Sequence, residues 1–134
     1  MTTLDENEID TGDKILDQKL KNWLKWDKID SESYREVVWM IREKMFEVLG
    51  SIMGKRLKFG VAGIRGKMGV GLSQLNDLTI IQTSQGLVHY VSEAVGEEKE
   101  VKEVIVGHDG RHNSRRWALL TSGVFLRRGF KVRL

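Results

Sequence analysis

Residues 101–134 read VKEVIVGHDGRHNSRRWALLTSGVFLRRGFKVRL, and this stretch decides the fold. The β-rich run of residues 101–106 is typical of a strand. After a polar loop, Ser114 can cap a helix that Gly129 ends. Three alternating apolar residues then predict a second strand: Phe130, Val132 and Leu134. A strand, a helix and a strand in this order predict a βαβ unit with parallel strands, and therefore an α/β protein.

The chain before residue 55 divides into a polar tail and a helical region. Residues 1–14 are acidic and show no period, so we interpret them as a mobile tail. Over residues 15–54, apolar positions recur at helical spacing and predict two helices. Ser33 and Glu36 match a capping box, which predicts that the second helix begins there, and Gly50 is expected to end it. The two apolar stripes are Leu16, Leu20, Trp23 and Leu24, and then Tyr34, Val37, Val38, Ile41, Met45, Val48 and Leu49.

Five glycines lie within residues 59–71, which read FGVAGIRGKMGVG. Glycine lets a backbone approach a ligand closely. The spacing fits neither the dinucleotide fingerprint G-x-G-x-x-G nor a P-loop. What remains is a loop that presents Arg65 and Lys67, and these cations together with exposed backbone N–H groups suit a phosphate. A glycine-rich hairpin without a ligand is the alternative.

A long helix is predicted between the glycine segment and the strand at residues 101–106. Asn76 or Asp77 can cap its start, the helix covers residues 78–95, and Gly96 ends it. The predicted organisation is therefore a tail over residues 1–14, a helical extension over residues 15–54 and an α/β domain over residues 55–134.

The polar loop GHDGRHNS of residues 107–114 contains three candidate metal ligands, His108, Asp109 and His112. A fourth ligand is not evident, and arginines lie close by, so we assign no metal site. Asp109 and Arg111 are expected to tie the loop to itself or to a neighbour by charge-assisted hydrogen bonds. The sequence contains neither a G-x-S-x-G nor an H-E-x-x-H motif, which argues against the common hydrolase chemistries.

The composition is that of one globular domain, with 134 residues, 40% hydrophobic and 31% charged. No apolar run approaches the roughly 20 residues of a membrane-spanning helix. The chain contains no cysteine, which fits a reducing compartment, so we expect a cytoplasmic protein. Residues 107–134 contain seven Lys and Arg residues and only one acidic residue. Such a segment attracts phosphates, whether on nucleic acid or on a metabolite.

Three segments, spread over about residues 16–134, resemble one family, the α-D-phosphohexomutases. KFGVAGIRG at residues 58–66 resembles the family's F-G-T-A-G-L-R-G signature, and NDLTIIQ at residues 76–82 continues it. GHDGRHNSRR at residues 107–116 resembles the family's G-x-D-x-R-x-x-S element. Residues 16–27 resemble the N-terminal extension of the phosphopentomutase/phosphoglucomutase branch.

The resemblance implies an enzyme that interconverts a sugar 1-phosphate with the 5- or 6-phosphate through a bisphosphate. It implies a three-layer α/β/α first domain with a mixed sheet, a phosphoserine donor, and Mg²⁺ and glucose 1,6-bisphosphate as cofactors. Arg65 matches the arginine that lies beside the phosphoserine, and Gly66 and Lys67 join it as expected phosphate-binding residues. Asp109 and Arg111 are expected to support the site structurally. The role implied for Arg65 is physically reasonable, because phosphoryl transfer needs positive charge around the transferred oxygens.

The chain also departs from the family pattern. Val61 stands where the family usually has threonine, so the loop lacks that hydroxyl group. The serine loop T-A-S-H-N-P, the metal loop D-x-D-x-D-R, the sugar loop G-E-x-S-G and the phosphate loop R-x-S-G-T are all absent from the sequence. We therefore expect neither a catalytic residue nor a metal ligand in this segment, and no mutase activity from the chain alone.

Because the sequence stops within the second strand, we interpret it as a first domain that is incomplete at its C-terminal edge. Such a piece is expected to be marginally stable and to self-associate, while the full-length enzyme is expected to be a monomer. The expected partner is a phosphosugar, and neither nucleic acid nor a membrane. Two alternatives remain open: a fragment of a glucose 1,6-bisphosphate synthase, and a non-catalytic module that binds phosphate-rich partners.

Overall fold

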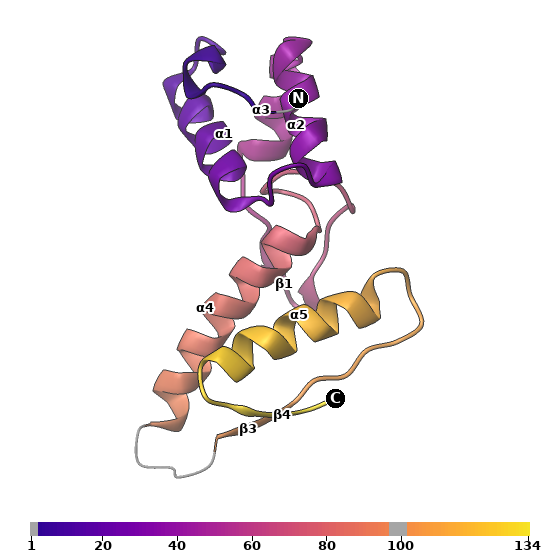
Figure 1. Ribbon diagram of the computed structural model, residues 1–134. Helices are drawn as coiled ribbons and strands as arrows, with labels where there is room; N and C mark the ends of the chain where they lie inside the picture. Colours follow the sequence, from indigo (N-terminus) through magenta and orange to yellow (C-terminus); the bar gives the residue numbers. More distant parts are fainter. Residues whose placement is uncertain (1–2, 97–101) are drawn as a thin grey trace. The chain divides into compact units, whose positions relative to one another are not determined.

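The computed structural model describes residues 3–96 and 102–134 of the chain. These residues form an α/β protein with five α-helices, one short 3₁₀ helix and two small two-stranded sheets (Figure 1). The chain divides into two compact units, Met1–Thr79 and Ile80–Leu134. Helix α4 (Asp77–Val95) begins in the first unit and continues through the second. The predicted boundaries at residues 14/15 and 54/55 stay predictions.

The first unit is built on three helices, α1 (Lys14–Trp26), α2 (Glu32–Arg42) and α3 (Phe46–Met53). Helix α3 packs against both α1 and α2 (Figure 1). The apolar stripes meet in one core, and its fully buried side chains are Leu20, Trp23, Val37, Leu49 and Met53. Asp13 caps α1 by accepting the backbone N–H groups of Ile15 and Leu16. The stripe predicted for the first helix is confirmed.

The second helical region differs from the prediction at both of its ends. Ser31, and not Ser33, caps α2 by accepting the Tyr34 N–H at 3.1 Å. The Ser33 hydroxyl donates to the Asp27 carboxylate at 2.6 Å, and Ser33 lies inside the first turn of α2 rather than before it. The predicted single helix is also interrupted at Lys44, whose φ of 55° is incompatible with a continuous right-handed helix.

Gly50 therefore does not end a helix, because it lies within α3. The acidic tail also differs from the mobile segment that its lack of period predicts. It holds the 3₁₀ helix η1 (Glu6–Glu8), and Leu4 and Ile9 are buried in the core of the first unit. The Thr11 hydroxyl donates to the Asp17 carboxylate at 2.6 Å and ties the tail to α1. Two buried apolar residues and the Thr11 hydrogen bond thus attach the tail to the helices.

The second unit contains the predicted βαβ arrangement. Strand β3 (Glu103–Ile105) pairs in parallel with β4 (Lys131–Arg133), with Val104 opposite Val132. Helix α5 (Ser114–Arg127) connects the two strands and lies along them (Figure 1). Its core joins Val88, Phe125 and Phe130, and the two phenylalanine rings meet edge to face at 5.2 Å. Val101, the predicted first strand residue, lies outside the described residues.

The ends of these helices largely follow the prediction. Gly96 and Gly129 adopt φ values of 74° and 82°, as helix-terminating glycines do. Ser114, however, is the first residue of α5 and not its cap, because Asn113 occupies the cap position with a left-handed φ of 62°. Within the described residues, no helix combines the length and the apolar character needed to cross a membrane.

Candidate functional site

The glycine segment of the first unit folds into a short hairpin. Strand β1 (Phe59–Gly60) pairs antiparallel with β2 (Gly63–Ile64), so that Val61 and Ala62 form a two-residue turn. Gly63 has a φ of 102°, a conformation that favours glycine over any L side chain. The Val61 side chain at the tip is fully exposed.

The base of this hairpin is anchored by backbone hydrogen bonds. The Leu57 N–H donates to the Leu72 carbonyl at 3.0 Å, and the Leu75 N–H donates to the Lys67 carbonyl at 2.7 Å. Gly71 is buried with a φ of 114°, and a Cβ there would lie 2.5 Å from the backbone oxygen of Ile52. The loop is therefore held close to α3 at its base, while its tip projects.

Asn76 connects the hairpin base to helix α4. Its side-chain amide donates to the carbonyls of Gly69 at 2.8 Å, Gly71 at 2.9 Å and Gln74 at 3.3 Å. Its side-chain oxygen accepts the Thr79 N–H at 2.9 Å, which confirms the predicted cap. The three carbonyl contacts were not predicted from the sequence. An asparagine before a helix indicates that its side-chain oxygen caps the helix, but it does not indicate what its amide nitrogen contacts.

Arg65, Gly66 and Lys67 are consecutive and all exposed. Within the described parts of the chain, neither the Arg65 nor the Lys67 side chain has a hydrogen-bond or ion-pair partner. Residues 54–76 contain three further basic residues, Lys55, Arg56 and Lys58, and no acidic residue. A cationic hairpin with open backbone and unpaired cations is suited to an anion with several oxygens, because a guanidinium and N–H groups can share them.

The second predicted element, the loop at residues 107–114, lies in the second unit. The Asp109 carboxylate accepts the backbone N–H of Arg111 at 2.9 Å and its Nε–H at 2.7 Å, so the expected charge-assisted tie within the loop is present. The backbone N–H of Asp109 donates to the Ser114 hydroxyl at 3.1 Å. Hydrogen bonds from the Arg111 backbone and guanidinium lower the pKa of Asp109 below its ordinary value.

Both members of this ion pair are exposed, so the pair organises the loop more than it stabilises the fold. Arg65 lies in the first compact unit and Asp109 in the second. Over residues 3–96 and 102–134, no three His, Asp or Glu side chains gather in a way that could hold a metal ion. These residues therefore supply no ligand set for the Mg²⁺ that the resemblance implies.

The described features define a class: an α/β protein with a cationic, glycine-rich hairpin preceding a βαβ unit. Residues 56–134 match the family model described as phosphoglucomutase/phosphomannomutase, alpha/beta/alpha domain I. The chain therefore belongs to the phosphoglucomutase/phosphomannomutase family, and this match includes both the hairpin and the Asp109 loop. The predicted family and its α/β/α domain class are thereby confirmed.

Curated relatives match a longer stretch of the chain. A probable phosphoribomutase of Schizosaccharomyces pombe is 39% identical over 120 residues, which are 90% of this chain and 20% of the relative. The human phosphopentomutase is 39% identical over 128 residues, 91% of this chain and 21% of its own. The human glucose 1,6-bisphosphate synthase is 35% identical over 130 residues, 92% of this chain and 21% of its own. No solved structure matches the chain significantly.

Proposed function

We propose that this chain forms the N-terminal part of a phosphosugar mutase of the phosphopentomutase or phosphoribomutase type. Such an enzyme interconverts a sugar 1-phosphate with the 5- or 6-phosphate of ribose or glucose through a bisphosphate. The relatives at 39% identity carry these names, and the chain spans about a fifth of their length. The absence of cysteine supports a cytoplasmic location as part of the same proposal.

The observation that carries the proposal is the anchored hairpin with Arg65 and Lys67 exposed and unpaired. Arg65 is proposed to hold the oxygens of a phosphoryl group, with the Gly66 backbone and Lys67 as further contacts. A guanidinium binds two such oxygens with its planar fork, whereas an ammonium acts as a point charge. Because the sequence has no serine loop and the described residues hold no metal cluster, no chemical step is assigned to this chain.

A chimaera tests whether the chain supplies this part of the enzyme. The chain replaces the matching segment of the Schizosaccharomyces pombe relative, and turnover of ribose 1-phosphate is measured in a coupled assay. We expect activity, and we expect Arg65→Ala to lower kcat about 10²–10³-fold, as removal of one transition-state donor does. Arg42→Ala on α2 is the matched control and is expected to change little, because Arg42 is exposed outside the hairpin. A folded but inactive chimaera contradicts the proposal.

A glucose 1,6-bisphosphate synthase is the second candidate, supported by the human relative of that name at 35% identity. In the chimaera, bisphosphate formation from glucose 1-phosphate and a phosphoryl donor, in the absence of mutase turnover, would favour it. A non-catalytic phosphate-binding module is the third candidate. Binding to unrelated nucleic acids with a steep salt dependence would favour that module over either enzyme.

A further inference from the structure

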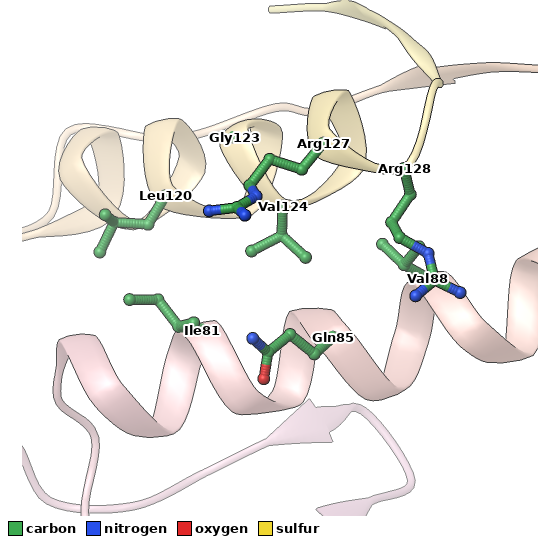
Figure 2. A pocket seen from close by; sticks show the side chains of 8 residues that line it. All are labelled: Ile81, Gln85, Val88, Leu120, Gly123, Val124, Arg127 and Arg128. Carbon is green, nitrogen blue, oxygen red and sulfur yellow. The ribbon is translucent and has the colours of Figure 1, made fainter. Parts of the chain in front are cut away.

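An open groove of about 840 Å³ lies between α4 and α5 within the second unit. Its aliphatic lining comes from both helices: Ile81, Val88, Leu120 and Val124 (Figure 2). The floor is continuous with the core of the unit, because Val88 is 1% exposed and packs with Phe125. The hydroxyls of Ser84 and Thr121 lie 2.9 Å apart and link the same two helices, which fixes the spacing across the groove.

Three polar residues, Gln85, Arg127 and Arg128, complete the lining of the groove. Figure 2 shows Arg127 at the end of α5 running back along that helix over Val124, Arg128 extending toward Val88 on α4, and Gln85 on the α4 side. In the part of the chain that the structure describes, neither arginine side chain has a hydrogen-bond or ion-pair partner. Gly123 also lines the groove, and a Cβ added there would meet nothing within 4 Å.

We propose that this groove binds a small amphiphilic anion, with one carboxylate or phosphate head and an aliphatic body. The volume is in the range of small-molecule sites, which are mostly apolar with a few polar groups that orient the ligand. Arg127 and Arg128 bind the head through charge-assisted hydrogen bonds, and the aliphatic floor covers the body. This site is separate from the hairpin and from the proposed phosphosugar chemistry.

The two arginines have an ordinary explanation as well, since cations near a helix C-terminus interact favourably with the helix dipole. That role needs neither an apolar floor nor an open space at Gly123. An interaction with the helix dipole also does not predict that the groove prefers an anionic over a cationic amphiphile. The two explanations therefore predict different outcomes in a competition experiment.

The experiment titrates the 134-residue chain with the anionic fluorophore anilinonaphthalene sulfonate and then adds competitors below their micelle concentrations. Decanoate and decyl phosphate are expected to displace the fluorophore, while decyltrimethylammonium, with the same tail and the opposite charge, is not. Their relative potencies distinguish a carboxylate from a phosphate head. The double variant R127Q/R128Q and the groove-filling Gly123→Leu are each expected to weaken decanoate binding about tenfold or more, as loss of charged hydrogen bonds or of apolar contact area does.

Matched controls separate the groove from general effects. R35Q/R42Q on α2 removes the same charge from the other unit, and Gly86→Leu adds the same side chain on α4 where a Cβ meets nothing within 4 Å. Both controls should keep decanoate affinity within about twofold, because neither touches the groove. The proposal would be overturned if decyltrimethylammonium displaced the fluorophore as well as decanoate does, or if the control variants lost as much decanoate affinity as the groove variants. It would also be overturned if fluorophore binding disappeared as the chain dimerises, and this outcome would identify a second copy as the occupant.

Discussion

Replacing Gly71 by alanine should destabilise the first unit strongly. Gly71 has a φ of 114°, and holding an L residue in a sparsely populated region costs about 1–3 kcal/mol. The new Cβ would also lie 2.5 Å from the Ile52 backbone oxygen and 2.7 Å from its Cβ, and neither atom can move without shifting α3. Overpacking of this kind costs about 1–3 kcal/mol.

The unfolded chain loses freedom when glycine becomes alanine, which offsets about 0.4–1 kcal/mol of this cost. The expected net loss for Gly71→Ala is therefore about 1–6 kcal/mol, a large share of a typical domain's stability. Gly86→Ala is the matched control, because Gly86 lies inside α4 with open space around its Cβ position. It should stabilise the chain by about 0.5–1 kcal/mol, since glycine disfavours helix interiors.

The assay is urea denaturation followed by tryptophan fluorescence and circular dichroism, with hydrogen exchange assigning each change to one unit. Opposite signs for Gly71→Ala and Gly86→Ala, with unchanged m-values, are the expected result. If Gly71→Ala fails to fold while Gly86→Ala folds, the result also supports the predicted destabilisation by Gly71→Ala. A stability for Gly71→Ala within about 0.5 kcal/mol of wild type, the ordinary range of surface substitutions, would refute the close approach of the hairpin base to α3.

Three further predictions concern the site and its supports. Asn76→Ala should lower the free energy of unfolding by about 1–3 kcal/mol in urea denaturation, because a helix cap and the amide contacts to the loop are lost together; Asn76→Asp, which keeps only the cap, should fall between. Carbon NMR titration should show the pKa of Asp109 below its ordinary value, and Arg111→Ala should raise it. Because the pKa of Asp109 is lowered in the folded chain, the Asp109–Arg111 pair contributes to folding stability above the ordinary carboxyl pKa. This contribution to stability disappears as the pH falls through the lowered pKa. The 134-residue chain alone should show no mutase turnover above a blank, since it has no phosphoserine loop.

The βαβ unit was predictable because its signals are local. Alternating apolar residues and two terminating glycines mark the elements, and Val104 and Val132 pair in the structure as this pattern requires. The break between α2 and α3 was not predictable in the same way. Apolar residues continue at helical spacing through residues 43–45, and the left-handed conformation of Lys44 has no sequence signature of its own.

The start of α2 shows why side-chain competition escapes a sequence reading. Ser31 and Ser33 are both acceptable caps, and the Asp27 carboxylate accepts the hydroxyls of both, but only the Ser31 oxygen also accepts the Tyr34 N–H. In the candidate site, too, some features were predictable from the sequence and others were not. The exposure of Arg65 and Lys67 follows from their place in a glycine-rich turn, whereas the contacts of Asn76 with three loop carbonyls depend on the folded path of the whole segment.

The most direct test of the central claim is calorimetric titration of the chain with glucose 1,6-bisphosphate. We expect saturable binding that Arg65→Ala weakens about tenfold or more and Arg65→Lys restores only in part, because an ammonium lacks the planar fork. Arg42→Ala should bind as the wild type does. Equal affinity in Arg65→Ala and wild type, or equal weakening by Arg42→Ala, would show that the hairpin is not the phosphate-binding element.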